Sequence, residues 1–187
     1  MKQYLIILAA VALLASCAEK KQSNVIIVPK QETAKPTGPV TMQDMNSRND
    51  VEWIGKTYQV VVTRKADPDL PMVEVETGRK AYDNRIRLVI KRPDGSEFFN
   101  KEFTKSAFES CLDENTRKTG VLLGVVLDRA EDDNLIFAAS VGSPDALSDE
   151  YIPMVLTISR MGDVSIKRDT QMDTTSANRQ VDEDKGV

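Results

Sequence analysis

Short segments in which apolar and polar residues alternate, each followed by turn-forming residues, constrain the fold of this 187-residue chain most strongly. Residues 85–92 read RIRLVIKR, so an extended chain places three aliphatic side chains on one face and basic side chains on the other. Residues 93–96 (PDGS) have the composition of a turn, and residues 97–103 (EFFNKEF) complete a predicted hairpin. This period of two is typical of a strand that is buried on one side.

The same pattern extends over most of the chain and predicts its fold class. Residues 121–127 (VLLGVVL) are apolar on both faces, which is typical of a central strand, and residues 104–115 have the spacing of one short α-helix. We predict a mainly β domain, an antiparallel β-sandwich or curled β-meander of about eight short strands with that helix. The predicted strands cover residues 51–65, 72–76, 85–92, 97–103, 121–127, 135–141, 151–160 and 163–168.

The N-terminus has the pattern of an export signal. One positive charge at Lys2 precedes an apolar run, Leu5 to Ala15, which is too short for a helix to cross a membrane but fits the core of a secretory signal peptide. The residues Leu14-Ala15-Ser16-Cys17 resemble the bacterial lipobox. That resemblance implies that residues 1–16 are a lipoprotein signal peptide and that Cys17 carries acyl chains, which anchor the protein in a membrane. An ordinary signal peptide that happens to end near a cysteine is the alternative.

Composition divides the remaining chain into three parts. Residues 17–50 are rich in polar residues and proline and predict a flexible tether, because such a segment buries too little apolar surface to offset its ordering entropy. Within it, residues 25–28 (VIIV) are either a strand that pairs with a sheet edge or an apolar patch in a linker. Residues 51–169 form the predicted globular domain, and residues 170–187 a disordered tail.

The residues next to Cys17 indicate where the predicted anchor lies. Ala18 differs from the aspartate that resembles an inner-membrane retention signal in enterobacterial lipoproteins, so we expect anchoring in the outer membrane. Surface lipoproteins of Bacteroidetes often carry several acidic residues after the cysteine, whereas Glu19 is followed here by Lys20 and Lys21. This difference favours the periplasmic face over the cell surface.

The order of the segments resembles a family. A lipobox, a polar tether, the run FFNKEF at residues 98–103, a short helix, the strand at 121–127 and a final hairpin through residues 161–163 are similar to uncharacterised lipoproteins of gut and oral Bacteroidetes. These proteins are grouped as a domain of unknown function, and the resemblance covers most of residues 50–170. It implies a small β-rich envelope domain without an established activity, and it supplies no catalytic residues.

The composition excludes several classes of chemistry. The sequence contains no histidine, so it has no Ser-His-Asp or Cys-His nucleophile, no histidine-ligated metal and no imidazole acid or base. Its formal net charge of −4 gives no basic surface for nucleic acid. Acidic residues at 128–134 and 145–150 offer oxygen ligands for Ca²⁺, but their spacing does not match an EF-hand, so we favour solvated turns. We predict no metal, cofactor or catalytic residue.

A few residues remain as candidate sites. Arg85, Arg87 and Lys91 share one face of a predicted strand and form a possible surface for an anion or an acidic partner such as lipopolysaccharide phosphate, although an ordinary exposed strand face is favoured. Cys111 lies among apolar residues and is expected to be a buried structural thiol. Trp53 is the aromatic residue considered for sugar stacking, with a core position as the favoured alternative.

These observations favour a non-enzymatic, lipid-anchored envelope protein that binds another envelope component. The alternative is a surface-exposed lipoprotein that binds a glycan or a peptide, which requires a concave pocket or an exposed aromatic side chain. An enzyme without histidine ranks third. It would need a pair of carboxyl groups in a cleft, with the pKa of one of them raised.

Overall fold

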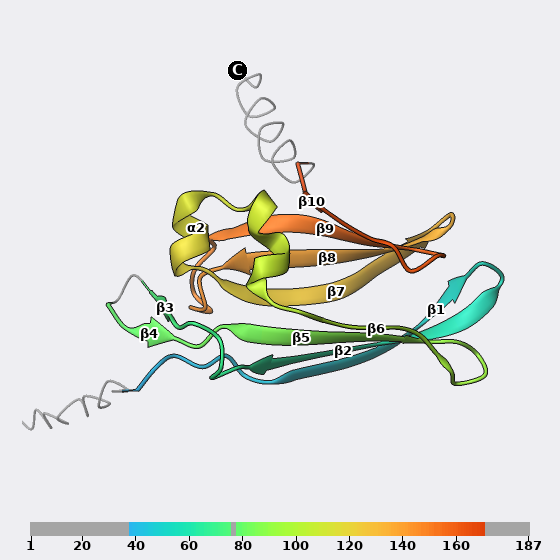
Figure 1. Ribbon diagram of the computed structural model, residues 1–187, viewed down its shortest axis with the longest axis horizontal. Helices are drawn as coiled ribbons and strands as arrows, with labels where there is room; N and C mark the ends of the chain where they lie inside the picture. The colour runs from blue at the N-terminus through green and yellow to red at the C-terminus, as the bar shows by residue number, and fades with distance from the viewer. Residues whose placement is uncertain (1–37, 76–77, 171–187) are drawn as a thin grey trace, which may run out of the picture. The chain divides into compact units, whose positions relative to one another are not determined.

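The computed structural model of the protein describes residues 38–75 and 78–170. In these residues ten antiparallel strands form three sheets, accompanied by one short α-helix and one 3-10 helix (Figure 1). The strands are β1 (Met45–Trp53), β2 (Lys56–Ala66), β3 (Val73–Glu74), β4 (Lys80–Ala81), β5 (Asn84–Lys91), β6 (Glu97–Phe103), β7 (Val121–Glu131), β8 (Asn134–Gly142), β9 (Tyr151–Ser159) and β10 (Val164–Arg168). The helices are η1 (Lys105–Cys111) and α2 (Glu114–Thr119). The predicted mainly β class is confirmed.

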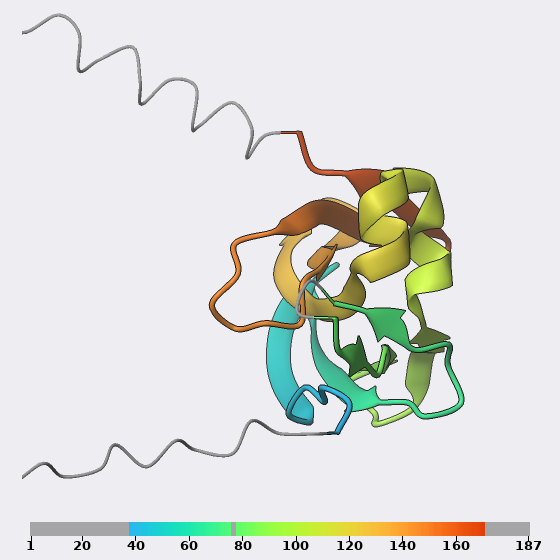
Figure 2. The same cartoon turned by 90° about the vertical axis from the view of Figure 1, so that its left-hand side faces the viewer.

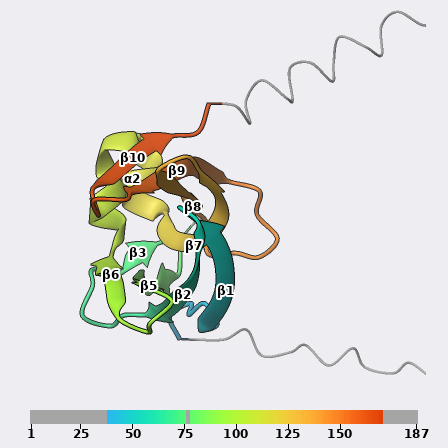
Figure 3. The same cartoon turned by 90° about the vertical axis from the view of Figure 1, so that its right-hand side faces the viewer.

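Two four-stranded sheets form the layers of a sandwich. The strand order is β1-β2-β5-β6 in the first sheet and β10-β9-β8-β7 in the second, while β3 and β4 pair separately. The two end-on views show these sheets as separate layers, with both helices on the side where β6 and β10 lie (Figures 2 and 3). The isolated bridge between Val40 and Ala81 adds the first described residues to β4.

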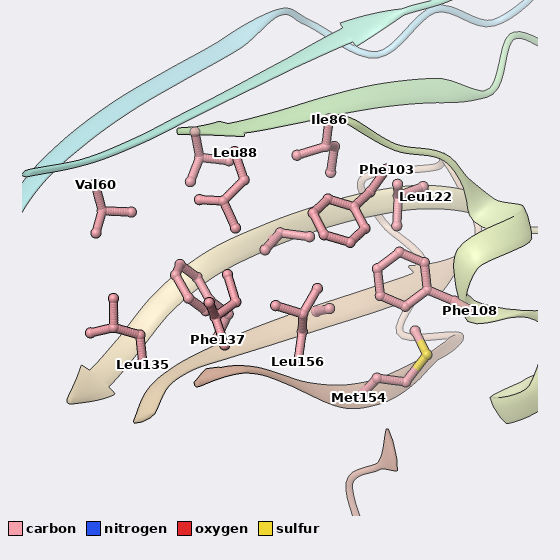
Figure 4. Close-up of a cluster of buried hydrophobic side chains, with 14 of the residues drawn as sticks. Val60, Ile86, Leu88, Phe103, Phe108, Leu122, Leu135, Phe137, Met154 and Leu156 are labelled. Atoms are coloured by element: carbon pink, nitrogen blue, oxygen red, sulfur yellow. The ribbon is translucent and has the colours of Figure 1, made fainter. Parts of the chain in front are cut away.

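The core lies between the two large sheets. Strands of the first sheet contribute Val60, Ile86 and Leu88, and strands of the second contribute Phe137 and Leu156, each with no exposed surface. Figure 4 shows these side chains pointing toward one another between the layers, with a phenylalanine of η1 closing one end. Full burial of one such side chain stabilises the fold by about 1.5–3 kcal/mol. Because every second residue of these strands is apolar, each sheet has an apolar face, and burial of the two faces against each other accounts for the sandwich.

Three predicted hairpins are present in the structure. β5 and β6 pair from Ile86 opposite Phe103 to Ile90 opposite Phe99, which places Phe103 in the core and Phe99 against it. The pairs β7–β8 and β9–β10 are also formed. The first has its turn within the predicted acidic segment 131–134, and the second has its turn around the predicted Met161 and Gly162.

The single strand predicted for residues 51–65 is wrong, because the structure forms a hairpin there. Ile54 and Gly55 both have positive φ values, 46° and 74°, which lets the chain reverse in two residues between β1 and β2. β1 begins at Met45, so the folded body starts before residue 51 and includes the end of the predicted tether. β1 escaped prediction because it is an outermost strand with mostly polar residues.

The prediction that residues 121–127 form a central strand is also wrong. β7 is the outermost strand of the second sheet, and the side chain of Val126 is half exposed. The apolar character of its first residues has another cause. Val121 and Leu123 pack in a small second cluster with Val73 and Ala81 of the short sheet, away from the main core.

The predicted helix at residues 104–115 divides into two elements. Residues 105–111 form the 3-10 helix η1, whose Phe108 is fully buried. The chain becomes extended at Leu112 and Asp113, and α2 starts at Glu114. The side chain of Asp113 accepts a hydrogen bond from the backbone N–H of Thr116 at 2.8 Å and thereby caps α2.

Several predictions fall outside the described residues: the signal peptide, Cys17, residues 25–28 and the tail from 171 onward. Among the residues that the structure describes, none of the helices has the length and apolar composition to cross a membrane.

Candidate binding cleft

A cleft of about 290 Å³ opens between α2, the connection from β8 to β9, and the end of β10. Most of its lining side chains are polar. They come from segments far apart in the sequence, which the sandwich brings to one end of the sheets (Figure 1). The polar lining includes Asp113, Asn115, Thr116, Glu150, Tyr151 and Arg168.

Two glycines line the cleft where backbone segments approach closely. A Cβ atom on Gly142 would lie 2.6 Å from the Cα of Tyr151 and closer still to the carbonyl oxygen of Glu150. A Cβ atom on Gly120 would lie 2.7 Å from the carbonyl oxygen of Thr116. Both contacts are with backbone atoms, which cannot rotate away, so this part of the cleft has a fixed shape.

The cap of α2 also sets the charge of the cleft. The pKa of Asp113 is lowered, first by its hydrogen bond from the backbone N–H of Thr116, then by the Thr116 hydroxyl and more weakly by the positive charge of Arg168. Asp113 is therefore ionised at neutral pH and accepts hydrogen bonds. A general acid needs the opposite shift.

Four other lining residues have side-chain polar groups free to bond a ligand. In the described part of the chain, the side chains of Asn115, Glu150, Tyr151 and Arg168 make no hydrogen bond or ion pair, although the charge of Arg168 acts on Asp113. Tyr151 is 49% exposed and the next residue, Ile152, is buried, as in the alternation along the rest of β9. The cleft thus offers a carboxylate, an amide, a guanidinium and a phenol ring in one place.

A second cluster of polar groups is buried and has a structural role. Oδ1 of Asp83 accepts hydrogen bonds from the backbone N–H groups of Asn84, at 2.7 Å, and Leu122, at 2.8 Å, and so joins β5 to β7. The ammonium group of Lys105 donates to the carbonyl oxygens of Gly120, at 2.7 Å, and Arg117, at 3.0 Å, at the end of α2.

The same ammonium group lies 3.8 Å from Oδ2 of Asp83. Burial lowers the pKa of Lys105, and the negative charges of Asp83 and Glu109 oppose this shift. Both groups line a hollow of about 420 Å³, but they are already bonded to the protein. This cluster holds the helices on the sandwich, and the first cleft is the better candidate for a ligand.

The predicted basic face lies on the outer side of the first sheet, remote in sequence from the residues of the cleft. Arg85 is held by two acids: its Nε lies 2.6 Å from Asp67, and its Nη1 lies 3.2 Å from Glu102. These contacts raise the pKa of Arg85. The pKa of Asp67 is lowered, first by a hydrogen bond from the backbone N–H of Asp69 and then by Arg85. Arg85 is therefore engaged within the protein.

The other two residues of this face lie at alternating positions of β5 with Arg85. Arg87 is exposed and donates a hydrogen bond to the side-chain oxygen of Asn100 at 3.1 Å. Lys91 is half-buried and lies opposite Glu97 of β6. On the side of β6, Arg87 and Lys91 thus lie opposite the acidic residues Glu102 and Glu97.

The remaining candidate residues have local partners. In the acidic turn, Arg129 bonds both Asp128 and Glu131, and Arg160 lies 3.4 Å from Asp133. Among the described residues no group of three or more acids and cysteines is placed to hold a metal ion.

The two apolar candidates pack against the core. Cys111 is a free, half-buried thiol beside the main hydrophobic cluster. Trp53 is only 2% exposed and packs against Tyr58 at 5.1 Å between ring centroids, so its position is in the core.

The cleft was not predicted from the sequence. Its residues are separated by up to several tens of positions, and no motif joins them. Two signals were present: a glycine at the end of β8, and Tyr151 directly after a polar loop. The sequence nominates Trp53 as the aromatic candidate for sugar stacking, whereas the aromatic residue of the cleft is Tyr151.

Comparison with known proteins identifies a family for this chain but no individual relative. No curated protein matches the chain. Residues 26–166 match the family described as "Domain of unknown function (DUF4738)", which covers nearly all of the described body. The match agrees with the expected grouping among domains of unknown function. Because it spans most of the sequence, this chain belongs to the DUF4738 family.

Proposed function

We propose that this protein is a lipid-anchored, non-catalytic binding module of the bacterial cell envelope. The observation that carries the binding role is the cleft beside α2, where the side chains of Asn115, Glu150, Tyr151 and Arg168 make no hydrogen bond or ion pair within the described part of the chain. A ligand can bond to these groups without breaking a hydrogen bond inside the protein. Such convergent polar groups in a concave site are typical of ligand-binding sites.

The lipid anchor is proposed from the sequence. The segment Leu14-Ala15-Ser16-Cys17 resembles the lipobox, and the uncharacterised lipoproteins of Bacteroidetes that the chain resembles carry the same feature. Each buried methylene contributes about 0.8 kcal/mol, so two or three acyl chains on Cys17 give a stable anchor. We propose attachment to the outer membrane, with the domain on its periplasmic face.

We propose another envelope component as the partner. The outer face of the first sheet offers Arg87 and Lys91 to an acidic partner, while Arg85 is engaged by two carboxylates. A second candidate function is a surface-exposed lipoprotein that binds a glycan or a peptide. The half-exposed ring of Tyr151 in the cleft favours this candidate.

Metabolic labelling with an alkyne fatty acid tests the anchor. The native protein should be labelled, and Cys17→Ser should abolish the label. Cys111→Ser is the matched control because it removes the other cysteine of the sequence and should leave labelling unchanged. Labelling that persists in Cys17→Ser would contradict the anchor.

Protease shaving of a C-terminal tag tests the location. Loss of the tag only after the outer membrane is permeabilised supports the periplasmic face, and loss from intact cells supports the surface. Cross-linking in living cells then tests for a partner. Repeated failure to recover a cross-linked component, with the tagged protein itself recovered, would contradict the leading proposal.

A further inference from the structure

We propose that the cleft beside α2 binds a saccharide, with the ring of Tyr151 stacked on one face of a sugar. This inference rests on the proposed binding function of the same cleft and names the chemistry of its ligand. It follows from the exposed ring, from the mixture of donors and acceptors around it, and from the rigid glycine-lined part of the cleft.

The ring of Tyr151 is left uncovered by its neighbour across the sheet. Tyr151 lies directly opposite Gly142 in the β8–β9 ladder. An ordinary cross-strand side chain would pack against the ring, but glycine has none, and Tyr151 remains 49% exposed. The other aromatic residues that the structure describes are buried or half-buried. An apolar face with a polar tip suits a ligand that is apolar on one face and carries hydroxyl groups at its edge.

The polar groups around the ring match hydroxyl groups better than they match an ion. Asp113 and Glu150 accept hydrogen bonds, Arg168 donates them, and the amide of Asn115 does both. A sugar hydroxyl both donates and accepts, so each of these groups finds a partner. Two carboxylates against one guanidinium disfavour a phosphate or another strong anion, because like charges would be brought together.

The size and stiffness of the cleft fit a short stretch of sugar. Its volume of about 290 Å³ lies at the lower end of the range for small-molecule sites. The close backbone approaches at Gly120 and Gly142 fix part of the wall before the ligand arrives. A preformed site loses little conformational entropy on binding, which favours affinity for a small polar ligand.

Saturation-transfer difference NMR on the protein as purified from the membranes or soluble fraction of the cells that produce it tests the inference. The protein is held in a detergent without a sugar headgroup, and the probes are maltohexaose, xylohexaose, cellohexaose, mannohexaose and chitohexaose. We expect saturation transfer to at least one of them. Tyr151→Ala should weaken binding of that oligosaccharide about tenfold, which corresponds to about 1.4 kcal/mol and is the scale of one aromatic contact. Tyr151→Phe keeps the ring and should bind within about threefold of the native protein.

Two further variants separate a lost contact from a damaged fold. Met161→Ala removes an exposed apolar side chain, 78% exposed, that does not line the cleft, and it should bind as the native protein does. Asn115→Ala removes an exposed cleft side chain outside the sheets and should weaken binding several-fold with an unchanged melting temperature.

Two results would overturn the inference: no transfer to any of the five oligosaccharides, or binding that survives both Tyr151→Ala and Asn115→Ala. Its failure can be told apart from failure of the proposed function. A lipidated protein that cross-links to an envelope component but binds none of the sugars overturns the saccharide alone. A protein that binds a sugar but shows no labelling at Cys17 overturns the anchor alone.

Discussion

Ile54 has a backbone conformation that its side chain disfavours. Its φ of 46° is in the left-handed region, where a β-branched residue is an outlier, yet the two-residue turn between β1 and β2 requires positive φ at this place. Asparagine and glycine are the residues that usually occupy such a position. The turn therefore forms because the pairing of β1 with β2 imposes it, from Trp53 opposite Lys56 outward.

Ile54→Asn should relieve this strain. Ile54→Ala is the matched control, because it shortens the side chain but keeps the unfavourable conformation. We expect the Ile54→Asn protein to be more stable than the Ile54→Ala protein by about 1 kcal/mol, measured as the free energy of unfolding in urea. Equal stability of the two variants would show that the turn is not strained.

Asp67 gives stability a dependence on pH. Its pKa is lowered by the backbone N–H of Asp69 and by Arg85, so the folded protein binds the proton less tightly than the unfolded chain does. The stabilisation is fully present above the unfolded pKa of about 3.9 and is lost as the pH falls through the lower folded pKa.

Asp67→Asn should therefore be less stable than the native protein near pH 6, and the difference should shrink below about pH 4. Urea unfolding at a series of pH values measures it. Glu74→Gln, which removes an exposed carboxylate on β3, is the control. A difference that stays constant down to about pH 2 would contradict the role assigned to the Asp67 carboxylate.

At the scale of elements, the close contact of β8 with the start of β9 depends on a missing side chain. Gly142 has backbone atoms of Glu150 and Tyr151 where its Cβ would be, whereas Gly124 on the neighbouring strand β7 has no atom within 4 Å of that position. The two glycines thus provide a matched pair within one sheet.

Gly142→Ala should lower the free energy of unfolding by roughly 1–3 kcal/mol, because the backbones must separate. Gly124→Ala should leave it unchanged or raise it by up to about 1 kcal/mol, since alanine loses less entropy on folding. Thermal and urea unfolding measure both. Equal effects of the two substitutions would contradict the close contact.

The elements also show what the sequence could and could not predict. β5 and β6 were predicted because Ile86, Leu88 and Ile90 alternate with charged residues and a turn follows. β1 was missed because a polar strand at the edge of a sheet has no apolar period, and its turn lacks the usual asparagine. The break between η1 and α2 is marked by a local cap at Asp113, which the apolar spacing of residues 104–115 does not reveal. The apolar face of β7 depends on its contact with Val73, which is a tertiary effect.

The candidate site is harder to predict from the sequence than the strands are, because it depends even more on contacts between distant segments. The sequence predicted Arg85, Arg87 and Lys91 as one face because alternate residues of a strand share a face by geometry. Asp113, Tyr151 and Arg168 come together only because α2 packs beside β9 and β10 of the second sheet, and the residue pattern of a single segment does not predict such a contact.

At the scale of the whole described body, the residues before β1 belong to the fold. The backbone of Val40 bonds to Lys80 at 2.7 Å and to Tyr82 at 3.0 Å, and the carbonyl oxygen of Gln43 accepts a hydrogen bond from Arg64 at 2.8 Å. These contacts tie the short sheet and β2 to the segment that enters β1.

A chain that starts at Met45 should therefore be less stable than one that starts at Gly38, by roughly 1–3 kcal/mol for the lost hydrogen bonds and the buried groups left without partners. Both chains should show the same mainly β circular dichroism, and thermal unfolding should give the lower melting temperature for the shorter one. Equal melting temperatures would show that residues 38–44 lie on the fold without supporting it.

The cleft has a wall formed at Gly120 and Gly142 and a rim of polar side chains, and this division has a consequence for evolution. A substitution at Gly120 or Gly142 forces backbones apart, so selection for stability opposes it. Asn115, Tyr151 and Arg168 support few contacts of the core, so they can change at little cost to the fold. A lineage can therefore acquire new ligands by exchanging rim residues while the scaffold beneath them stays the same.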